Sequence, residues 1–402
     1  MKVLHIVPFM AQRYGGSNKA VMDYCIGLSR YGIDTTIYTT NIDGKDKLKV
    51  PLEKQLLIQG VKIWYFSVQT PRYFFTSFPL AEKLRREIKN FDIVHITSIY
   101  SFSALIGAYY CQKYNIPYII NVAGDLNPHK LNRHFIRKIV YMNLRLKNDL
   151  KKARMVHFTN IKEWKNAVFV KSKIKEVIIN RCIVSIPISL KYESPLRIST
   201  GKFRKLHPQL ADNPIILYLG RINYVKGLDN LCRAFIQVLK QRQNAWLVLA
   251  GPDDGNYLYK LKKQLKKGNV LDNVIFTGPI YDNSKNEAML DADIFVLPSY
   301  SENFGISAFE AMSFGLPVIL SDKADMAKEL ADVTMVVDCS GDQLTEAIIK
   351  LIDNKELRKK LGSHAKQYVK KYSIDIITKK LIKTYQSAIE QNNSFNKNRM
   401  AI

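Results

Sequence analysis

The stretch PSYSENFGISAFEAMSFGLPVI, residues 298–319, decides the fold. It follows a β-rich apolar run at 293–297 and reads as a turn that opens a helix over 305–315, which ends at a Gly-Leu-Pro sequence. Glu302 stands in the turn, whereas Glu310 stands more than one turn inside the helix. The two carboxylates therefore act separately and do not form one acid/base pair.

This arrangement fits a ligand with three polar parts in a row. The backbone N–H groups and the dipole of the helix receive a phosphate, and each carboxylate accepts hydrogen bonds from a different polyol. A nucleotide-sugar has that layout, because its diphosphate lies between the sugar hydroxyls and the ribose hydroxyls. The alternative interpretation is structural, with Glu302 as a capping residue and Glu310 on the helix surface.

Outside this stretch, short apolar runs alternate with segments of helical period, which is typical of a parallel sheet covered by helices on both faces. The chain has 402 residues, more than one hydrophobic core usually holds. Residues 187–213 carry three prolines and no clear period, so we place a domain boundary there. The expected strands are 3–7, 35–39, 61–66, 92–97, 117–122, 154–159 and 176–179 before that boundary, and 214–219, 246–250, 273–277, 293–297, 317–320 and 333–337 after it.

The charge is positive and uneven. The chain carries 61 Lys+Arg against 35 Asp+Glu, a formal net charge of +26. Residues 1–190 hold 30 basic and 12 acidic residues, so +18 of that charge lies in the first half. Such a field attracts polyanions, which could be nucleic acid, an anionic membrane surface or phosphorylated small molecules.

Composition narrows the class of protein further. The sequence has no apolar run long enough to span a bilayer, and its five cysteines are widely spaced without a CxxC pair. Neither a membrane span, a zinc site nor a disulfide framework is predicted. The first residues, MKVLHIVPFM, lack the pattern of a signal peptide, and we expect the mature chain to begin at Met1 and stay inside the cell.

A glycine pair follows the first expected strand, in GGSNKA at 15–20. Gly15 and Gly16 let the backbone approach a ligand and offer free N–H groups to an anion, although a plain turn is the alternative. The pair lacks the G-x-G-x-x-G spacing of a nicotinamide or flavin site, which argues against an oxidoreductase.

A second loop, LGRINYVKGLD at 219–229, opens the second half. A strand ends there at Gly220, and Arg221 and Lys226 bracket the loop before the next helix. Guanidinium and ammonium groups in this position can neutralise a diphosphate. The alternative is a solvated surface pair.

These motifs together resemble one family over nearly the whole chain. It is the retaining glycosyltransferases of family 4, whose GT-B fold has two facing, doubly wound (Rossmann-like) parallel-sheet domains. The E-x7-E element, with its flanking PS, ENFG, EAM and G-x-P-V sequences, is the most specific match. The matching residues are Gly15-Gly16, Gly220-Arg221 with Lys226, Gly251-Pro252, Pro298-Ser299, and Glu302 with Glu310.

The resemblance implies a role for each of these groups in donor binding and catalysis. It implies that Arg221 and Lys226 clamp the donor diphosphate beside Gly220, that Glu302 holds the sugar hydroxyls, and that Glu310 binds the ribose. It also implies that Gly15-Gly16 lets the first domain's loop close on the phosphate and acceptor. The backbone expected near the sugar and phosphate is that of Asn303, Phe304 and Gly305.

The implied chemistry needs neither a protein nucleophile nor a metal. Fixed cations stabilise the leaving nucleoside diphosphate, and in such enzymes the departing phosphate oxygen takes the acceptor proton on the same face of the sugar, which gives retention. We therefore expect Glu302, Arg221 and Lys226 to carry catalysis. The sequence Asp291-Ala292-Asp293 matches the D-x-D of metal-dependent transferases, but helix capping and entry into a strand account for it, and we expect no metal.

One departure from the family concerns the reacting sugar. Many relatives carry His-Gly after the fifth strand of the first domain, where this chain has Ala123 before Gly124. Asp125 is the nearest ionisable group and could face the acceptor, although a turn aspartate is the alternative.

A basic segment at 128–154 points to a membrane partner. It has nine basic residues, one acid and an apolar stripe at 131, 135, 139, 142 and 146, and an aromatic loop, PRYFFTSF, lies at 71–78. Such elements dock peripheral enzymes on anionic lipid, although the stripe could instead pack on the sheet. No nucleic-acid-binding module is recognisable, so nucleic acid is not an expected partner.

The sequence therefore predicts a retaining, metal-independent hexosyltransferase without a cofactor. Its donor would be a UDP- or GDP-linked sugar, and its acceptor a hydroxyl of a lipid-linked or cell-surface glycan, such as lipopolysaccharide or capsule, at the cytoplasmic face of the plasma membrane. The alternative is a non-catalytic relative that binds nucleotide-sugar or lipid beside another transferase. The expected domains are 1–190 for the acceptor and 191–373 for the donor, with a helix at about 374–390 crossing back and a disordered tail at 391–402.

Overall fold

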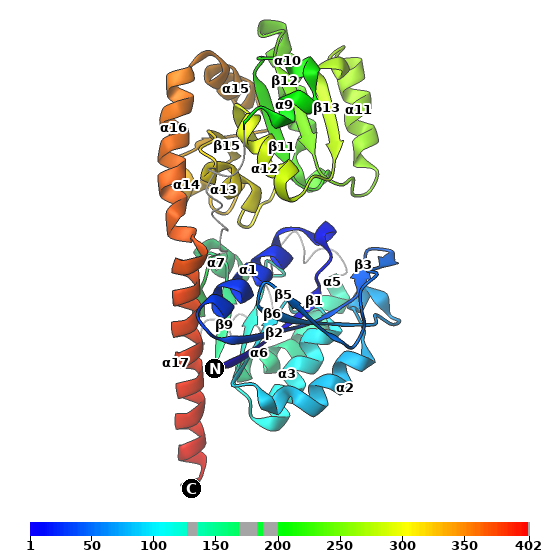
Figure 1. The fold of residues 1–402 in the computed structure, drawn as a ribbon, viewed down its shortest axis with the longest axis vertical. Helices are drawn as coiled ribbons and strands as arrows, with labels where there is room; N and C mark the ends of the chain where they lie inside the picture. The colour runs from blue at the N-terminus through cyan, green and yellow to red at the C-terminus, as the bar shows by residue number, and fades with distance from the viewer. Residues whose placement is uncertain (127–134, 169–182, 188–199, 401–402) are drawn as a thin grey trace. The chain divides into compact units, whose positions relative to one another are not determined.

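The computed structural model describes residues 1–126, 135–168, 183–187 and 200–400. The chain divides into two compact units, one of Met1–Ser189 with Ile374–Ile402 and one of Leu190–Ser373 (Figure 1). Both units are mixed α/β with parallel sheets, which confirms the predicted fold class of two Rossmann-like, doubly wound domains.

The first unit contains, in its described part, an eight-stranded sheet in the order β10-β9-β8-β7-β1-β2-β6-β5. Neighbouring strands are parallel except for β5, which runs antiparallel to β6 at the edge. The strands are β1 Lys2–Phe9, β2 Asp34–Thr40, β5 Gln55–Ile58, β6 Val61–Phe66, β7 Ile93–Thr97, β8 Tyr118–Asn121, β9 Met155–Phe158 and β10 Ile183–Ser185, with a small hairpin of β3 Ile42–Asp43 and β4 Asp46–Lys47.

The helices of the first unit connect these parallel strands. They are η1 Gln12–Tyr14, α1 Gly16–Arg30, η2 Arg72–Phe74, α2 Phe78–Glu87, η3 Ile88–Asn90, α3 Phe102–Tyr114, α5 Phe135–Tyr141, α6 Lys147–Lys152 and α7 Ile161–Val168, with a π-helical segment, η4 Met142–Leu146, between α5 and α6.

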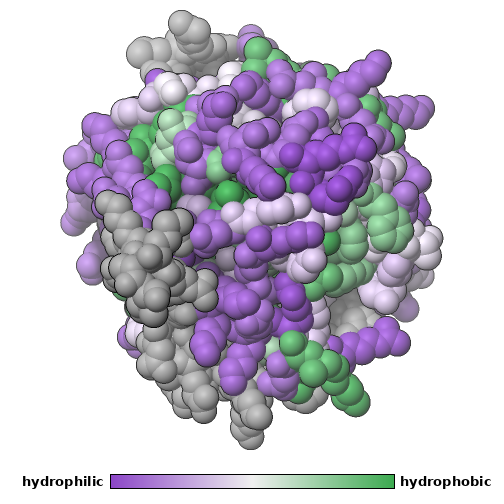
Figure 2. Space-filling model, turned by 90° about the horizontal axis from the view of Figure 1, so that it is seen from below, coloured by the Kyte–Doolittle hydropathy of each residue, from purple (hydrophilic) through white to green (hydrophobic). Residues whose placement is uncertain are grey.

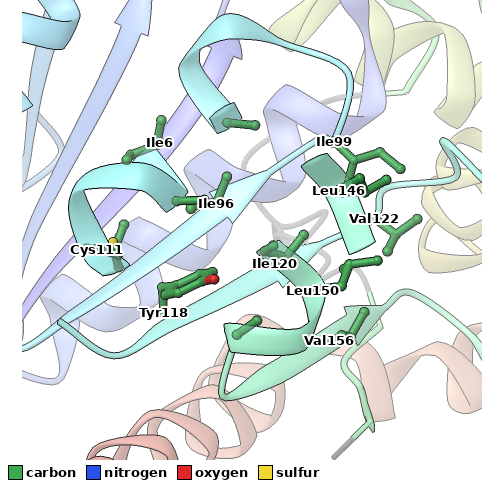
Figure 3. Close-up of a cluster of buried hydrophobic side chains, with 14 of the residues drawn as sticks. Ile6, Ile96, Ile99, Cys111, Tyr118, Ile120, Val122, Leu146, Leu150 and Val156 are labelled. Carbon is green, nitrogen blue, oxygen red and sulfur yellow. The ribbon is translucent and has the colours of Figure 1, made fainter. Parts of the chain in front are cut away.

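The core of this unit lies between the sheet and the helices α2, α3 and α6. Buried aliphatic side chains from the central strands meet those of α6 and of the η4 segment, as Figure 3 shows for Ile96, Ile120, Val156, Leu146 and Leu150. A second cluster around Val7 and Ile37 packs against α1 on the other side of the central strands. The central strands are buried on both faces, which explains their nearly continuous apolar sequences.

The second unit contains a six-stranded parallel sheet in the order β13-β12-β11-β14-β15-β16. The strands are β11 Ile215–Leu219, β12 Trp246–Ala250, β13 Val274–Gly278, β14 Ile294–Leu297, β15 Val318–Ser321 and β16 Met335–Val337. The helices are α9 Lys202–Leu206, η6 Pro208–Leu210, η7 Tyr224–Lys226, α10 Leu228–Gln241, α11 Tyr257–Lys267, η8 Leu271–Asn273, α12 Asp282–Asp291, α13 Ile306–Ser313, α14 Ala327–Leu330, α15 Gln343–Asp353, α16 Lys355–Tyr368 and η9 Val369–Tyr372.

The strand order reverses between β11 and β14. In open α/β sheets, ligands bind beyond the carboxyl ends of the strands at such a switch point. The two loops that the sequence singled out, 219–229 and 298–305, follow β11 and β14. The topology therefore brings both loops to the place where a ligand is expected.

The expected strands are confirmed wherever the structure describes them, and residues 176–179 lie outside the described residues. Strands β3, β4, β5 and β10 were not predicted, because they are short and two of them form only a hairpin. The last helix, α17 Ile374–Met400, belongs to the first unit and packs on α1, where a Cβ on Gly27 would lie 2.0 Å from Oγ1 of Thr378. Helix α17 also runs through most of the tail expected to be disordered, because neither Gly nor Pro interrupts residues 391–400.

Candidate functional site

The loops after β11 and β14 are held together at the switch point of the second unit. Gly227 has a φ of +63°, and a Cβ there would lie 2.1 Å from the backbone oxygen of Pro298. The backbone N–H of Tyr300 also donates to the carbonyl of Val225 at 2.9 Å. Only glycine allows this approach, so the sequence Lys226-Gly227 fixes the lysine beside the second loop.

Lys226 and Glu302 form an ion pair across these loops. The Nζ atom of Lys226 lies 2.5 Å from Oε2 of Glu302, and the side chains are 18% and 14% exposed. Ser299, which is buried, places its hydroxyl 3.5 Å from the same carboxylate oxygen. The site thus holds a cation and an anion that compensate each other and that a ligand with both phosphate and hydroxyl groups can separate.

Helix α13 begins beside this pair. Its N-cap is Gly305, with a φ of +78° and no side-chain capping bond, so the first amides of the helix are left to a ligand or to solvent. The Phe304 ring is buried and stacks on Phe309 at 4.4 Å between centroids, which anchors the turn. Because its ring is buried, Phe304 can face a ligand only through its backbone.

Glu310 lies inside α13 and pairs with a residue that the sequence analysis missed. Its Oε1 atom lies 2.7 Å from Nζ of Lys285 on α12, and the two side chains are 12% and 18% exposed. Glu302 and Glu310 thus have different cationic partners, which agrees with separate roles. No spacing rule links positions 285 and 310, so sequence reasoning could not find this lysine.

Arg221 lies on the open side of the site. Its Nη1 atom lies 3.0 Å from Oδ2 of Asp254, and both side chains are about half exposed. Behind it, the buried Tyr218 hydroxyl donates to the Arg221 carbonyl at 2.8 Å, and burial followed by the Glu302 charge raises the pKa of Tyr218. Gly220 and Gly251 also cross closely, since a Cβ on Gly251 would lie 1.8 Å from the Gly220 oxygen.

Gly15 and Gly16 lie at the corresponding switch point of the first unit, between β1 and β7. Gly15 has a φ of +74°, forms the N-cap of α1 and has open space where a Cβ would stand. The Asn18 amide donates to the Ala11 carbonyl at 2.9 Å and ties the helix start to the end of β1. The backbone of the glycine pair is accordingly exposed at the carboxyl end of the sheet.

Asp125 lies in the loop after β8 of the same unit. Its Oδ2 accepts hydrogen bonds from the Ser98 hydroxyl at 2.7 Å and the Ile99 amide at 3.1 Å, so it links two loops. Ala123 has a φ of +50°, and the Gly124 amide donates to the carboxylate of buried Glu163. These contacts agree with the turn-aspartate alternative.

Glu163 is a second residue that the sequence analysis missed. Its own amide donates to Oδ1 of Asn160 at 2.7 Å, and its Oε2 accepts from both the amide and the hydroxyl of Thr159 at 2.7 Å. The arrangement resembles a capping box, except that the glutamate accepts from Thr159, the residue before the N-cap Asn160. The Asn-x-x-Glu spacing was the signal available in the sequence.

The D-x-D sequence has a structural role. Asp291 accepts hydrogen bonds from the amides of Gly201 and Arg204, at 2.5 and 3.1 Å, and so fixes the start of α9. Asp293 accepts from the Ile215 amide at 2.9 Å and from the Arg204 guanidinium at 3.1 Å. Both carboxylates are thus used in packing α9 and β11 together.

Two family models match the chain and together extend over most of it. Residues 14–187 match Glycosyltransferase Family 4, and residues 200–368 match Glycosyl transferases group 1. The chain belongs to the group 1, family 4 type of glycosyltransferases. The E-x7-E element, the Arg221-Lys226 loop and the Gly15-Gly16 pair all lie inside the matched residues.

Curated relatives of this chain come from archaea, bacteria and a plant. An uncharacterized glycosyltransferase of Methanocaldococcus jannaschii is 32% identical over 208 residues, which are 50% of this chain and 51% of that protein. The alpha-monoglucosyldiacylglycerol synthase of Streptococcus pneumoniae is 26% identical over 73% of this chain and 64% of its own length. A Campylobacter jejuni enzyme, N,N'-diacetylbacillosaminyl-diphospho-undecaprenol alpha-1,3-N-acetylgalactosaminyltransferase, is 27% identical over 76% of this chain and 80% of its own.

Solved structures share the GT-B fold of this glycosyltransferase. Anabaena HepE in complex with UDP and glucose superposes with a TM-score of 0.75 at 18% identity, over 96% of this chain and all of that one. Sucrose-phosphate synthase from Thermosynechococcus elongatus gives a TM-score of 0.72 at 19% identity, over 97% and 99% of the two chains. At these identities the likeness concerns the fold alone.

Proposed function

We propose that this protein transfers a hexosyl unit from a nucleotide-diphosphate sugar to a hydroxyl of a lipid-linked or cell-surface glycan, with retention and without a metal. The observation that carries the proposal is the Lys226–Glu302 pair beside the uncapped start of α13, at the switch point of the second unit. A cation, free helix amides and a carboxylate within one site match the diphosphate and hydroxyls of such a donor.

Without a donor, the charged side chains of the site pair with one another. The bound donor replaces these ion pairs with contacts of its own. The diphosphate takes Lys226 and the amides of α13, while the sugar hydroxyls donate to the freed carboxylate of Glu302. Arg221, which is about half exposed, is free to swing from Asp254 to the diphosphate at a small cost, because exposed ion pairs contribute little. Glu310, buried beside Lys285, accepts the ribose hydroxyls.

Retention follows if the bond from the anomeric carbon to the diphosphate oxygen breaks while the acceptor binds on the same face. That oxygen takes the proton of the acceptor hydroxyl, and the acceptor oxygen bonds to the anomeric carbon. Lys226 and Arg221 stabilise the charge that develops on the diphosphate, and pre-oriented cations are most effective on such developing charge. The proposed donor is UDP- or GDP-linked, and residues 191–373 would hold it.

The proposed acceptor lies at the inner face of the plasma membrane and binds the first unit. The Streptococcus and Campylobacter relatives are named for a diacylglycerol and an undecaprenol product or substrate, and residues 1–190 carry a net charge of +18. Among the described residues, no helix is long and apolar enough to cross a bilayer.

A specific observation favours a second candidate, a non-catalytic protein that binds nucleotide-sugar beside another transferase. Ala123 stands where the resemblance to family 4 predicts a histidine, and the Asp125 carboxylate is used to link two loops. Slow hydrolysis of the bound donor separates the two candidates. We expect release of nucleoside diphosphate that persists in EDTA and falls in Lys226→Ala; donor binding without any release would favour the second candidate.

A further inference from the structure

The segment from α5 to α6 presents apolar side chains on two faces. In the stripe predicted from the sequence, Met142 and Leu146 are buried in the core and Ile139 packs against it, while residue 131 lies outside the described residues. A different set of residues, four apart and therefore on one face of a helix, points outward. Ile136 is 77% exposed, Val140 50% and Leu144 79%.

Such a set of exposed apolar side chains needs a partner. Single exposed apolar residues are ordinary, but contiguous ones mark interaction surfaces. For comparison, the face of the molecule drawn in Figure 2 is mainly hydrophilic, and its hydrophobic residues appear in small groups.

An open groove of about 630 Å³ runs beside this stripe. Its lining includes Phe74 from the aromatic loop at 71–78, Leu105 of α3 and Tyr141 of α5. The rings of Phe74 and Tyr141 lie 6.3 Å apart between centroids, so the aromatic loop and the basic helix meet although they are far apart in sequence. The groove therefore offers an almost wholly apolar surface of the size of a hydrocarbon chain.

The rim of the groove is cationic. Residues 135–152 hold six basic residues and one acid, Asp149. The Asp149 side chain is buried, with 3% exposed, and its carboxylate accepts hydrogen bonds from Arg145 at 3.0 Å and Gln112 at 2.8 Å. It therefore adds little negative charge to the surface. Arg137 and Arg145 line the groove. Arg137 is exposed, whereas Arg145 is paired with Asp149 and its Nη2 atom is buried.

We propose that this face, formed by Ile136, Val140, Leu144 and the groove, docks on a bilayer of anionic phospholipid. The three aliphatic side chains enter the acyl layer, the groove covers part of one acyl chain, and the exposed Arg137 reaches the lipid phosphates. Charge complementarity selects this occupant, since apolar side chains beside basic ones are the pattern of interfacial helices. The inference rests on the proposed membrane location of the acceptor and specifies the surface responsible.

Vesicle binding tests the inference without any sugar nucleotide. The full chain is sedimented with phosphatidylglycerol/phosphatidylcholine vesicles at low salt, as wild type, Ile136→Asp, Leu144→Asp and the control Leu206→Asp. Leu206 is 69% exposed on α9 of the other unit, so the control adds the same charge elsewhere. We expect at least a tenfold loss of partitioning in the two groove variants and wild-type behaviour in the control.

A second measurement remains informative if an aspartate variant misfolds. In Leu144→Trp, vesicles with brominated acyl chains should quench the emission of the new tryptophan, whereas Leu206→Trp should stay unquenched. Wild-type protein that does not sediment, or equal sedimentation of Leu144→Asp, would overturn the proposal. A dimer that Leu144→Asp dissociates, without vesicle binding by the wild type, would overturn it in favour of a contact between copies. A UDP-induced thermal shift, measured on the same samples, keeps the donor site a separate question.

Discussion

The Nζ atom of Lys226 lies 2.5 Å from Oε2 of Glu302, and the two residues come from loops that follow the two strands flanking the switch point of one sheet. In the absence of a donor, the two residues compensate each other's charge. A donor must open this ion pair, so each of the two residues is predicted to contribute both to the stability of the unliganded chain and to donor binding.

Removing the lysine should weaken both the fold and the reaction. Lys226→Ala leaves a largely buried carboxylate unpaired, which should lower the free energy of unfolding by about 1–3 kcal/mol. Loss of a cation from the leaving diphosphate should lower kcat/KM by about 10²–10³-fold. Urea unfolding and donor hydrolysis measure the two effects. The double variant Lys226→Ala/Glu302→Ala should recover part of the stability and none of the activity; recovery of neither would contradict the pairing.

Glu310→Gln should act mainly on donor affinity. The amide keeps the size of the side chain but loses the charge that faces Lys285 and the proposed ribose hydroxyls. We expect KM for the nucleotide-sugar to rise about tenfold, as for the loss of one charge-assisted hydrogen bond of about 1.5 kcal/mol, with a smaller change in kcat. Steady-state kinetics give both constants. A fall in kcat alone would place Glu310 at the reacting bond instead.

Gly227→Ala should disrupt the site through the backbone. The new Cβ would meet the Pro298 oxygen at 2.1 Å and would also force a left-handed conformation on alanine. Gly255→Ala is the matched control, because Gly255 has a φ of +83° with open space around it. The control should lose about 1 kcal/mol of stability from conformation alone. Gly227→Ala should lose clearly more stability than the control and should also lose UDP binding. Equal losses in calorimetric unfolding would show that the loop contact is unimportant.

A chain of buried histidines should make the protein acid-sensitive. His95 lies 2.7 Å from the Tyr385 hydroxyl and 3.1 Å from His157, and His157 lies 2.9 Å from the Ile186 carbonyl. Burial, with a smaller contribution from His157, lowers the pKa of His5 to about 3, and burial lowers the pKa of His157 to about 4. The histidines thus stay neutral in the folded chain.

The sign of the effect follows from proton uptake on unfolding. Unfolded histidine has a pKa of about 6.5, so between pH 6.5 and about 4 the unfolded chain binds more protons and stability falls as the pH falls. Each such histidine should contribute a slope of about 1.4 kcal/mol per pH unit. Urea unfolding at pH 7, 6 and 5 measures the slope, and His157→Gln should reduce it by that amount. An unchanged slope in this variant would contradict the account.

Periodicity and chain topology made much of the fold predictable. Apolar runs such as Ile215–Leu219 and Ile294–Leu297 are typical of parallel strands that helices cover on both faces. The switch point of the sheet then brings the loop of Lys226 next to that of Glu302. The short edge strand Gln55–Ile58 was missed, because half-exposed edge strands have weak patterns.

The partners of the site residues were not predictable. Lys285 reaches Glu310 from another helix, and Asp254 reaches Arg221 from the loop after β12, so both pairings depend on tertiary packing. The basic segment shows the same limit. Its inward stripe was recognised, but the outward one at Ile136, Val140 and Leu144 became visible only when burial was known.

The most direct test of the proposed function is a thermal-shift screen against UDP, GDP, ADP, dTDP and CMP and their sugars, with wild type, Lys226→Ala and Glu310→Ala. The account predicts that one nucleotide raises the Tm of the wild type by several degrees, that its sugar does so as well, and that both variants lose the shift. A nucleotide that stabilises wild type and both variants equally would contradict the site proposed here, and no shift with any of them would contradict the proposed donor.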